Sequence, residues 1–260
     1  MKLLYLFFSL ISLLYCSAQN NNKSNGKIIY EVKVNFGLPK TENWFLFFDD
    51  NKSVYYIDKS FKPLEKDIPK VDEVIEIKTE DILPHIIFDF AKDSIYNQNM
   101  IFVKPYYVVD KILSPKWQIV KEYKTIGNYE CQKATTNFRG RNYIAWFAEK
   151  IPVKFGPWKL NGLPGLILEV QDELNVIKIT ATSIDIGSTL DFDFSTNSIP
   201  KKGKIISLKE YVVLKDNEYK EIRKYLISKQ ERNTEIEFNE SPVKRNGLEL
   251  IYEWEQNEKK

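Results

Sequence analysis

Apolar and polar residues alternate along most of this chain. Residues 27–36 show the pattern most clearly, because Ile28, Tyr30, Val32 and Val34 all fall on the same parity. Successive side chains of a strand point to opposite faces of a sheet, so this spacing predicts a half-buried β-strand. Similar patterns predict further strands at residues 43–49, 53–58, 94–97, 100–110, 117–123, 128–138, 142–147, 166–171 and 176–184.

Turn-forming residues separate these segments. The first segment ends at Gly37-Leu38-Pro39, and Arg139-Gly140-Arg141 would close a hairpin between residues 128–138 and 142–147. Short strands joined by tight turns, in a chain rich in aromatic residues, are typical of antiparallel sheets. We therefore expect a mainly β protein built on a curved antiparallel sheet, which forms either a half-barrel or a sandwich-like fold.

The spacing of apolar residues becomes helical near the C-terminus. Asp216 is a residue type that caps helices, and Tyr219, Ile222 and Leu226 follow it at intervals of three or four. This spacing predicts one amphipathic helix that ends near Arg232 and packs as a lid on the sheet.

Two other segments complete the prediction of secondary structure. Three prolines interrupt residues 59–92, which predicts a long surface excursion with a short helical turn near residues 86–90. The single histidine, His85, lies in this excursion without a partner motif, so we expect it to be structural or solvated. Residues 249–254 are expected to add a last strand.

The N-terminus has the features of a secretory signal. A basic start precedes an apolar run at residues 3–15 that is too short to span a bilayer comfortably, and Ala18 ends a cleavage site of small residues. We expect residues 1–18 to be removed, so that the mature chain begins at Gln19. Lipidation at Cys16 is the alternative.

The mature chain is expected to form one domain. Residues 19–26 are polar and rich in Asn, which predicts a disordered leader, and residues 27–256 are expected to form a single β-rich domain. No later segment is apolar and long enough for a membrane helix. The protein is therefore expected to be exported and to be periplasmic, associated with the outer membrane, or secreted.

Composition argues against several classes of chemistry. Lys and Arg total 38 against 36 Asp and Glu, and this small net charge argues against a nucleic-acid-binding protein. After signal cleavage the chain has one cysteine, Cys131, and it shows no metal-ligand cluster, phosphate loop or nucleophile elbow. We therefore predict no cofactor, no metal and no enzymatic activity, and we expect Cys131 to be a buried free thiol.

The densest group of glycine, proline and tryptophan residues lies just before residue 166. Gly162 and Gly165 permit unusual backbone angles and Pro164 fixes its own, so Leu163 would project from a rigid loop. The apolar residues 166–168 lack alternation, which predicts a strand buried on both faces. The loop is interpreted either as a crossover that closes one end of the sheet or as the wall of a site for an apolar ligand or a partner.

The candidate binding residues come from this loop and its neighbours. They are two tryptophans, four loop residues and the two arginines of the hairpin turn: Trp146, Trp158, Gly162, Leu163, Pro164, Gly165, Arg139 and Arg141. The arginines are expected to lie in an exposed turn, and binding of an anion or a carboxylate is the alternative. Glu149, Glu169 and Asp172 offer carboxylates, although acidic residues at strand ends are commonly solvated.

The same region resembles a known family. The motifs Ala145-Trp146-Phe147, Gly156-Pro157-Trp158 and Gly162-Leu163-Pro164-Gly165-Leu166-Ile167 are similar to those of the GLPGLI family of exported Bacteroidetes proteins. The resemblance covers about residues 117–172. It implies export and a β-rich fold, and it implies no reaction.

Three functions remain open from the sequence. The first is a non-enzymatic envelope protein that binds a lipid or other apolar ligand in the curved sheet, by analogy with a lipoprotein-carrier half-barrel. The second is an interaction partner of an outer-membrane receptor or secreted protein, which needs an exposed apolar patch. The third is a carboxylate-dependent hydrolase, which needs two carboxyls facing across a cleft.

Overall fold

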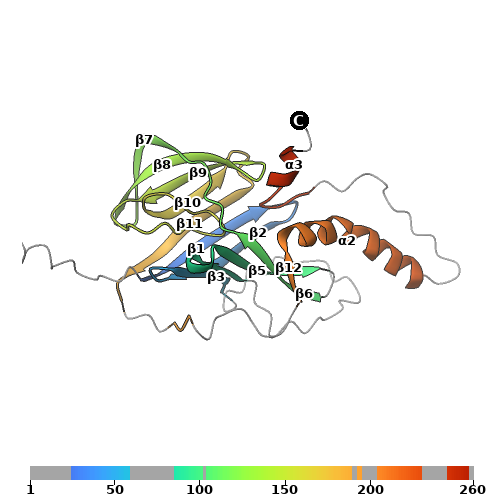
Figure 1. Cartoon of the computed structure of the whole chain (residues 1–260). Coiled ribbons are helices and arrows are strands. Elements are labelled where there is room, and N and C mark those ends of the chain that lie inside the picture. Colours follow the sequence, from blue (N-terminus) through green and yellow to red (C-terminus); the bar gives the residue numbers. More distant parts are fainter. Residues whose placement is uncertain are drawn as a thin grey trace, which may run out of the picture.

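The structure is a computed structural model of the chain, and it describes residues 25–58, 85–101, 104–188, 192–194, 204–229 and 245–257 (Figure 1). The predicted signal peptide with its cleavage site at Ala18 and Gln19, and nearly all of the predicted leader, lie outside these residues. Export and the single domain over residues 27–256 therefore stay predictions.

Strands dominate the described residues. They are β1 (Gly26–Asn35), β2 (Pro39–Phe48), β3 (Lys52–Ile57), β4 (His85–Asp89), β5 (Ser94–Ile101), β6 (Lys104–Lys111), β7 (Gln118–Ile126), β8 (Tyr129–Phe138), β9 (Arg141–Ala148), β10 (Leu166–Asp172), β11 (Ile177–Ile186) and β12 (Lys204–Ser207). They form one sheet in the order β12-β6-β5-β4-β3-β2-β1-β11-β10-β9-β8-β7. Only the β12–β6 pairing is parallel.

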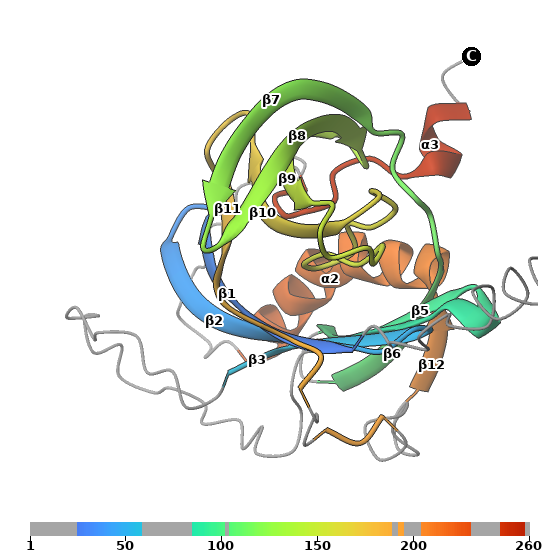
Figure 2. The ribbon, with the colours of Figure 1, turned by 90° about the vertical axis from the view of Figure 1, so that its left-hand side faces the viewer.

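Two meanders of strands meet at the pairing of β1 with β11. Strands β1 to β6 run outward from this junction in one direction, and β7 to β11 return to it from the other. Figure 2 shows β7 to β11 curling into an arch above the flatter half of the sheet. The edges at β12 and β7 do not pair with each other, so the sheet is open, and the prediction of a mainly β, curved antiparallel sheet is confirmed.

The inner face of the curved sheet carries the core, as the alternation along the chain predicted. Ile28 and Tyr30 of β1 and Leu46 and Phe48 of β2 are fully buried and point to this face. The Tyr30 hydroxyl donates a 2.6 Å hydrogen bond to the carbonyl oxygen of Ile167 in the opposite arch. A buried hydroxyl needs such a partner, and this bond links the two halves of the fold.

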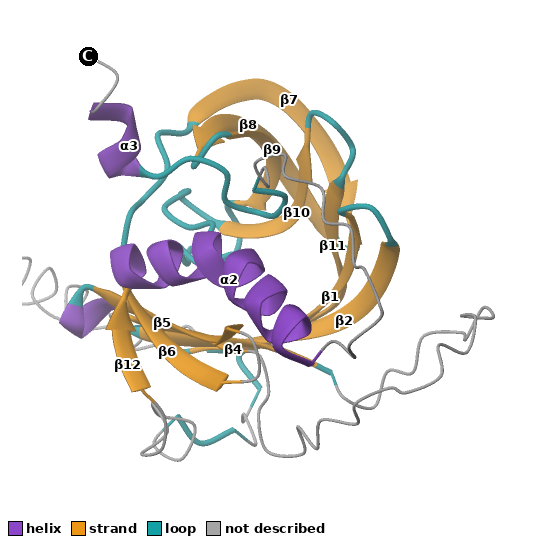
Figure 3. Cartoon of the chain, turned by 90° about the vertical axis from the view of Figure 1, so that its right-hand side faces the viewer, coloured by secondary structure: helices purple, strands orange, loops and turns teal. Residues whose placement is uncertain are grey.

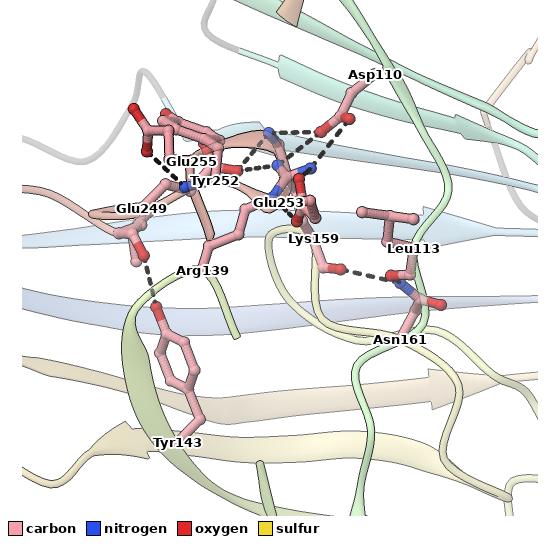
Figure 4. Close-up of polar contacts among 11 residues, drawn as sticks. Asp110, Leu113, Arg139, Tyr143, Lys159, Asn161, Glu249, Tyr252, Glu253 and Glu255 are labelled. Carbon is pink, nitrogen blue, oxygen red and sulfur yellow. Dashed lines mark hydrogen bonds and ion pairs between the residues drawn. The ribbon is translucent and has the colours of Figure 1, made fainter. Parts of the chain in front are cut away.

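The loop between β9 and β10 fills the space inside the arch. Its apolar side chains, among them Phe155, Leu160 and Leu163, are buried in the same core. Asn161 fastens the loop to the β6–β7 crossover, because its side-chain amide donates to the carbonyl oxygen of Leu113 at 3.1 Å (Figure 4). The loop is therefore part of the packed interior.

The strand after this loop is buried on both faces, as predicted. Residues 166–168 are fully buried, and the register of β10 against β9 shifts between Ile167 and Glu169. The shift is a bulge at Leu168, which redirects the side chains of a strand.

The C-terminal helix begins earlier than the sequence-based prediction. It is α2 (Leu208–Lys229), and not a helix capped by Asp216. Ser207 and Glu210 form a capping box: Ser207 Oγ accepts from the Glu210 N–H at 3.2 Å, and the Glu210 carboxylate accepts from the Ser207 N–H at 2.8 Å. The lid placement is confirmed in part, since α2 lies across the β5, β6 and β12 part of the sheet (Figure 3).

Two short segments differ from their predictions. Residues 86–90 are not a helical turn, because His85–Asp89 forms β4 between β3 and β5, and the short 3₁₀ helix η1 (Phe90–Lys92) follows. Residues 249–254 are not a strand. The Glu255 carboxylate accepts from the Tyr252 N–H at 2.8 Å and caps helix α3 (Glu253–Asn257).

Candidate functional site

A cleft of about 600 Å³ lies between the inner face of the sheet, α2 and residues 245–257, which we call the C-terminal segment. Trp44, Asn97 and Asn99 reach it from strands β2 and β5. His85 and Ile86 of β4 and Gln98 of β5 line it as well. The remaining lining side chains come from the β9–β10 loop, from α2 and from the C-terminal segment, and they include Trp158, Lys159, Tyr211, Lys215, Asp216, Glu218, Ile222, Arg245, Asn246, Glu249 and Tyr252.

One face of α2 serves both the core and the cleft. Five of the α2 residues that line the cleft follow one another at intervals of three, one, three and seven residues. They are Leu208, Tyr211, Val212, Lys215 and Ile222. This spacing places them on one side of a helix. Leu208 and Val212 are also buried in a second apolar cluster, so the helix is anchored at its N-terminal end beside the site.

Arg139 is the centre of a buried charge network at one end of the cleft (Figure 4). Its guanidinium donates twice to Asp110, at 2.7 and 3.1 Å, and donates to Glu253 at 2.9 Å and to Glu249. The Lys159 ammonium donates to Asp110 at 3.1 Å and to Glu249 at 2.8 Å. Two cations thus share the carboxylates of Asp110 and Glu249.

The network fixes the ionisation of its members. Burial acts to raise the pKa of Asp110, but Lys159 and Arg139 outweigh burial and hold that pKa below its ordinary value. Burial acts to lower the pKa of Arg139, and the carboxylates of Asp110, Glu249 and Glu253 outweigh it and raise that pKa. Asp110 and Arg139 are therefore both charged at neutral pH, and their charges neutralise each other.

The two arginines also hold the C-terminal segment against the sheet. The backbone oxygen of Arg139 accepts from the Leu250 N–H at 2.9 Å, and Arg141 donates to the backbone oxygen of Gly247 at 2.6 Å. Arg141 donates in addition to Asp172 at 2.8 Å. These bonds fix one wall of the cleft to the β8–β9 hairpin.

Arg245 of the C-terminal segment links this segment to α2, which forms the opposite wall of the cleft. Its guanidinium donates to Asp216 of α2 at 2.5 and 2.9 Å and to Glu255 of α3 at 2.7 Å. Helix α2 and the segment are therefore linked by charge-assisted hydrogen bonds.

Aromatic side chains supply the apolar part of the lining. The Trp44 ring stacks on Tyr55 with centroids 4.8 Å apart. Trp158 packs edge-on against Phe138 and has φ 56°, a backbone region that bulky residues rarely adopt. Burial, followed by the charges of Glu249 and Glu218, raises the pKa of Tyr211 to about 12, so its hydroxyl remains a hydrogen-bond donor at neutral pH.

The structure separates the residues that the sequence singled out. Trp158 lines the cleft. Arg139 does not line it, but Arg139 donates a hydrogen bond to Glu249, which does. Leu163 and Pro164 line a different hollow of about 310 Å³ on the other side of the loop. Trp146 lies on β9 under the Lys124 ammonium, 4.4 Å from its ring centroid, and is absent from both linings.

The two glycines of the loop have structural roles. A Cβ at Gly165 would lie 2.3 Å from the carbonyl oxygen of Ala148, and a Cβ at Gly162 would lie 3.0 Å from Ser114. Gly162 also has φ +91°, which favours glycine.

The two arginines are not in an exposed turn. Arg139 is 3% exposed and Arg141 is 6% exposed, because the C-terminal segment covers the hairpin. The expectation that carboxylates at strand ends are solvated is also wrong for Glu169 and Asp172, which are buried and paired with Lys124 and Arg141.

The sequence reasoning missed most of the cleft. The sequence places Trp44 and Tyr252 only in predicted strands, and it gives no functional signal for Tyr211, Lys215 and Arg245. The helical spacing from Leu208 onward was the available signal for the α2 wall.

In the described ranges, no three His, Cys, Asp or Glu side chains are grouped to hold a metal ion, and no helix is long and apolar enough to cross a membrane.

Comparison with known proteins places the chain in a family. The model of the family "N-glycanase peptide, N-terminal domain" matches residues 28–211, and the chain belongs to that family. No curated protein matches the chain.

Solved structures of PNGF-II have a similar fold. One in space group C2 superposes with a TM-score of 0.53 at 15% identity, over 75% of this chain and 33% of that chain. Another, in space group P21, superposes with a TM-score of 0.51 at 16% identity, over 74% of this chain and 33% of that chain. At this identity the likeness shows the fold alone, and the chain spans about a third of the length of those structures.

Two sequence-based hypotheses are overturned by these matches. The assignment to the GLPGLI family is wrong, because the matched residues include the whole Gly162–Leu166 stretch and belong to the N-glycanase N-terminal domain family. The close contact at Gly165 shows that packing in this fold requires a glycine at that position. The function as an apolar-ligand protein is wrong as well, because the family match indicates a glycan-related role and the lining of the cleft carries six Lys, Arg, Asp and Glu side chains.

Proposed function

We propose that this protein recognises N-linked glycans in the cleft between the sheet, α2 and the C-terminal segment, and that it does so without cleaving them. Membership of the N-glycanase N-terminal domain family supports a glycan-related role. The PNGF-II structures are about three times as long as the part that this fold matches, which is consistent with an accessory role for this part.

The lining of the cleft is the observation that carries the proposal. A pyranose has apolar C–H faces and hydroxyl edges, so its sites combine flat aromatic rings with hydrogen-bonding groups. The cleft offers Trp44, Trp158 and Tyr211 beside the amides of Asn97, Asn99 and Asn246. Asn99 Nδ2 is buried and has no hydrogen-bond partner among the described residues.

The state of the carboxylates supports a non-catalytic role. A glycosidase needs one carboxyl that keeps its proton near neutral pH. Asp110 has a lowered pKa and is bound by Arg139 and Lys159. Asp110 is therefore not available as a general acid, and Glu249 is bound by the same two cations.

Export is part of the proposal. The signal-like N-terminus would deliver the protein to the periplasm, the outer membrane or the medium, where the protein can encounter glycoproteins of other cells.

Two measurements on the purified protein test the proposal. Isothermal titration with a free oligomannose N-glycan is expected to show saturable binding. Mass spectrometry of a glycopeptide after long incubation is expected to show the glycan still attached. Absence of binding would overturn the recognition role, and release of the glycan would overturn the non-catalytic role.

A further inference from the structure

The charged side chains that line the cleft neutralise one another. The cations are Lys159, Lys215 and Arg245, and the carboxylates are Asp216, Glu218 and Glu249. Lys159 contacts Glu249 at 2.8 Å, Lys215 contacts Glu218 at 2.5 Å, and Arg245 contacts Asp216 at 2.5 Å. Each of these three cations therefore already has a carboxylate partner.

The groups behind the lining shift this balance toward negative charge. Arg139 adds one cation, while Asp110, Glu253 and Glu255 add three carboxylates that bind Arg139, Lys159 or Arg245. The charged groups named here thus comprise four cations and six carboxylates, joined in three separate groups of ion pairs. His85 of β4 also lines the cleft, and its ring centroid lies 6.0 Å from that of Tyr107.

We infer that the cleft takes neutral oligosaccharides and rejects glycans whose bound arm carries sialic acid, sulfate or phosphate. This inference rests on the proposed glycan role and names the substrate class of the same site. An anionic sugar in the cleft would lose water and meet an excess of carboxylates, with its potential cationic partners already engaged.

A neutral sugar meets no such penalty. Its hydroxyls can bond to the amides of Asn97, Asn99 and Asn246 and to the Tyr211 hydroxyl, all of which are uncharged. Its C–H faces can lie on the tryptophan rings. The ion pairs then act as a rigid frame that holds α2 and the C-terminal segment at a fixed separation.

A pair of matched ligands tests the inference. One biantennary N-glycan is titrated with its arms capped by sialic acid and again after the caps are removed with a sialidase. We expect the uncapped glycan to bind at least about tenfold more tightly. Its affinity should also be the same at about 0.05 and about 0.5 M NaCl, because an uncharged ligand has no Coulomb interaction for salt to screen.

A variant separates charge from shape. Glu253→Gln removes one carboxylate of the excess from a side chain that is 46% exposed and does not line the cleft. It should narrow the ratio between the affinities for the uncapped and the capped glycan. Equal or tighter binding of the capped glycan would overturn the neutral-ligand inference and leave the glycan role standing, whereas failure of both glycans to bind would overturn both.

Discussion

Lys159 Nζ lies 2.8 Å from the Glu249 carboxylate and joins the β9–β10 loop to a segment 90 residues later in the chain. The Lys159 side chain is 1% exposed and that of Glu249 is 13% exposed, so the pair is nearly free of water. Removing one partner of a buried pair leaves the other charge uncompensated, which costs far more than losing a surface pair.

Lys159→Met is therefore expected to lower the free energy of unfolding by about 3–5 kcal/mol, because Asp110 and Glu249 lose a shared cation. Urea denaturation measures the change. The matched control is Lys224→Met, which removes a pair with Glu221 whose side chains are 73% and 64% exposed and should cost less than about 1 kcal/mol. Equal losses in both variants would contradict the buried-network account.

Acid is expected to weaken the same network. The folded-state pKa of Asp110 lies below its ordinary value, so this group contributes stability above its unfolded pKa and loses it as pH falls through the folded value. The loss should therefore occur below about pH 4. Thermal unfolding from about pH 2 to about pH 7 measures this loss of stability.

The variant Asp110→Asn should be less stable than the wild type at pH 7 and should lose less stability on acidification. Asp93→Asn, which changes an exposed carboxylate 3.7 Å from Lys111, is the control and should leave the acid profile as it is in the wild type. An Asp110→Asn profile parallel to that of the wild type would show that Asp110 does not carry this pH dependence.

Gly165→Ala should destabilise the fold strongly. The new Cβ would lie 2.3 Å from the carbonyl oxygen of Ala148 and 2.9 Å from the Cα of Glu149, and backbone atoms cannot move aside cheaply. We expect a loss of about 3 kcal/mol or more. Gly247→Ala is the control, since a Cβ there meets nothing within 4 Å, and it should stay within about 0.5 kcal/mol of the wild type. A neutral Gly165→Ala would refute the close packing of this loop.

Cys131 should be inert in the native protein. It is fully buried, and burial raises the pKa of its thiol to about 11, so little thiolate exists at pH 8. Peptide mass mapping after treatment with an alkylating reagent should find Cys131 unmodified in native protein and modified in urea. Rapid alkylation of Cys131 in the native protein would show that β8 opens readily.

The strands could be predicted because their signal is local. Alternation along β1 and the turn at Gly140 depend on neighbouring residues, and both are as expected. The start of α2 was also readable, because Ser207 and Glu210 have the spacing of a capping box.

The site could not be read in the same way. Arg139 lies in a hairpin turn, where exposure is the normal expectation, and it is buried only because residues more than 100 positions later fold over it. The aromatic and amide groups of the cleft come from strands, a loop, a helix and the C-terminal segment, and no periodicity links them. Such a site depends on tertiary contacts that local patterns do not contain.

The most direct test of the glycan role is calorimetric titration of a neutral oligomannose N-glycan into wild-type protein and two single variants. Trp44→Ala removes an aromatic ring from the cleft, and Tyr123→Ala removes a 58% exposed ring on β7, outside the cleft. The glycan role predicts binding by the wild type and by Tyr123→Ala, with an affinity at least about tenfold weaker for Trp44→Ala. Equal affinities of Trp44→Ala and the wild type, or no binding by any of the three proteins, would contradict it.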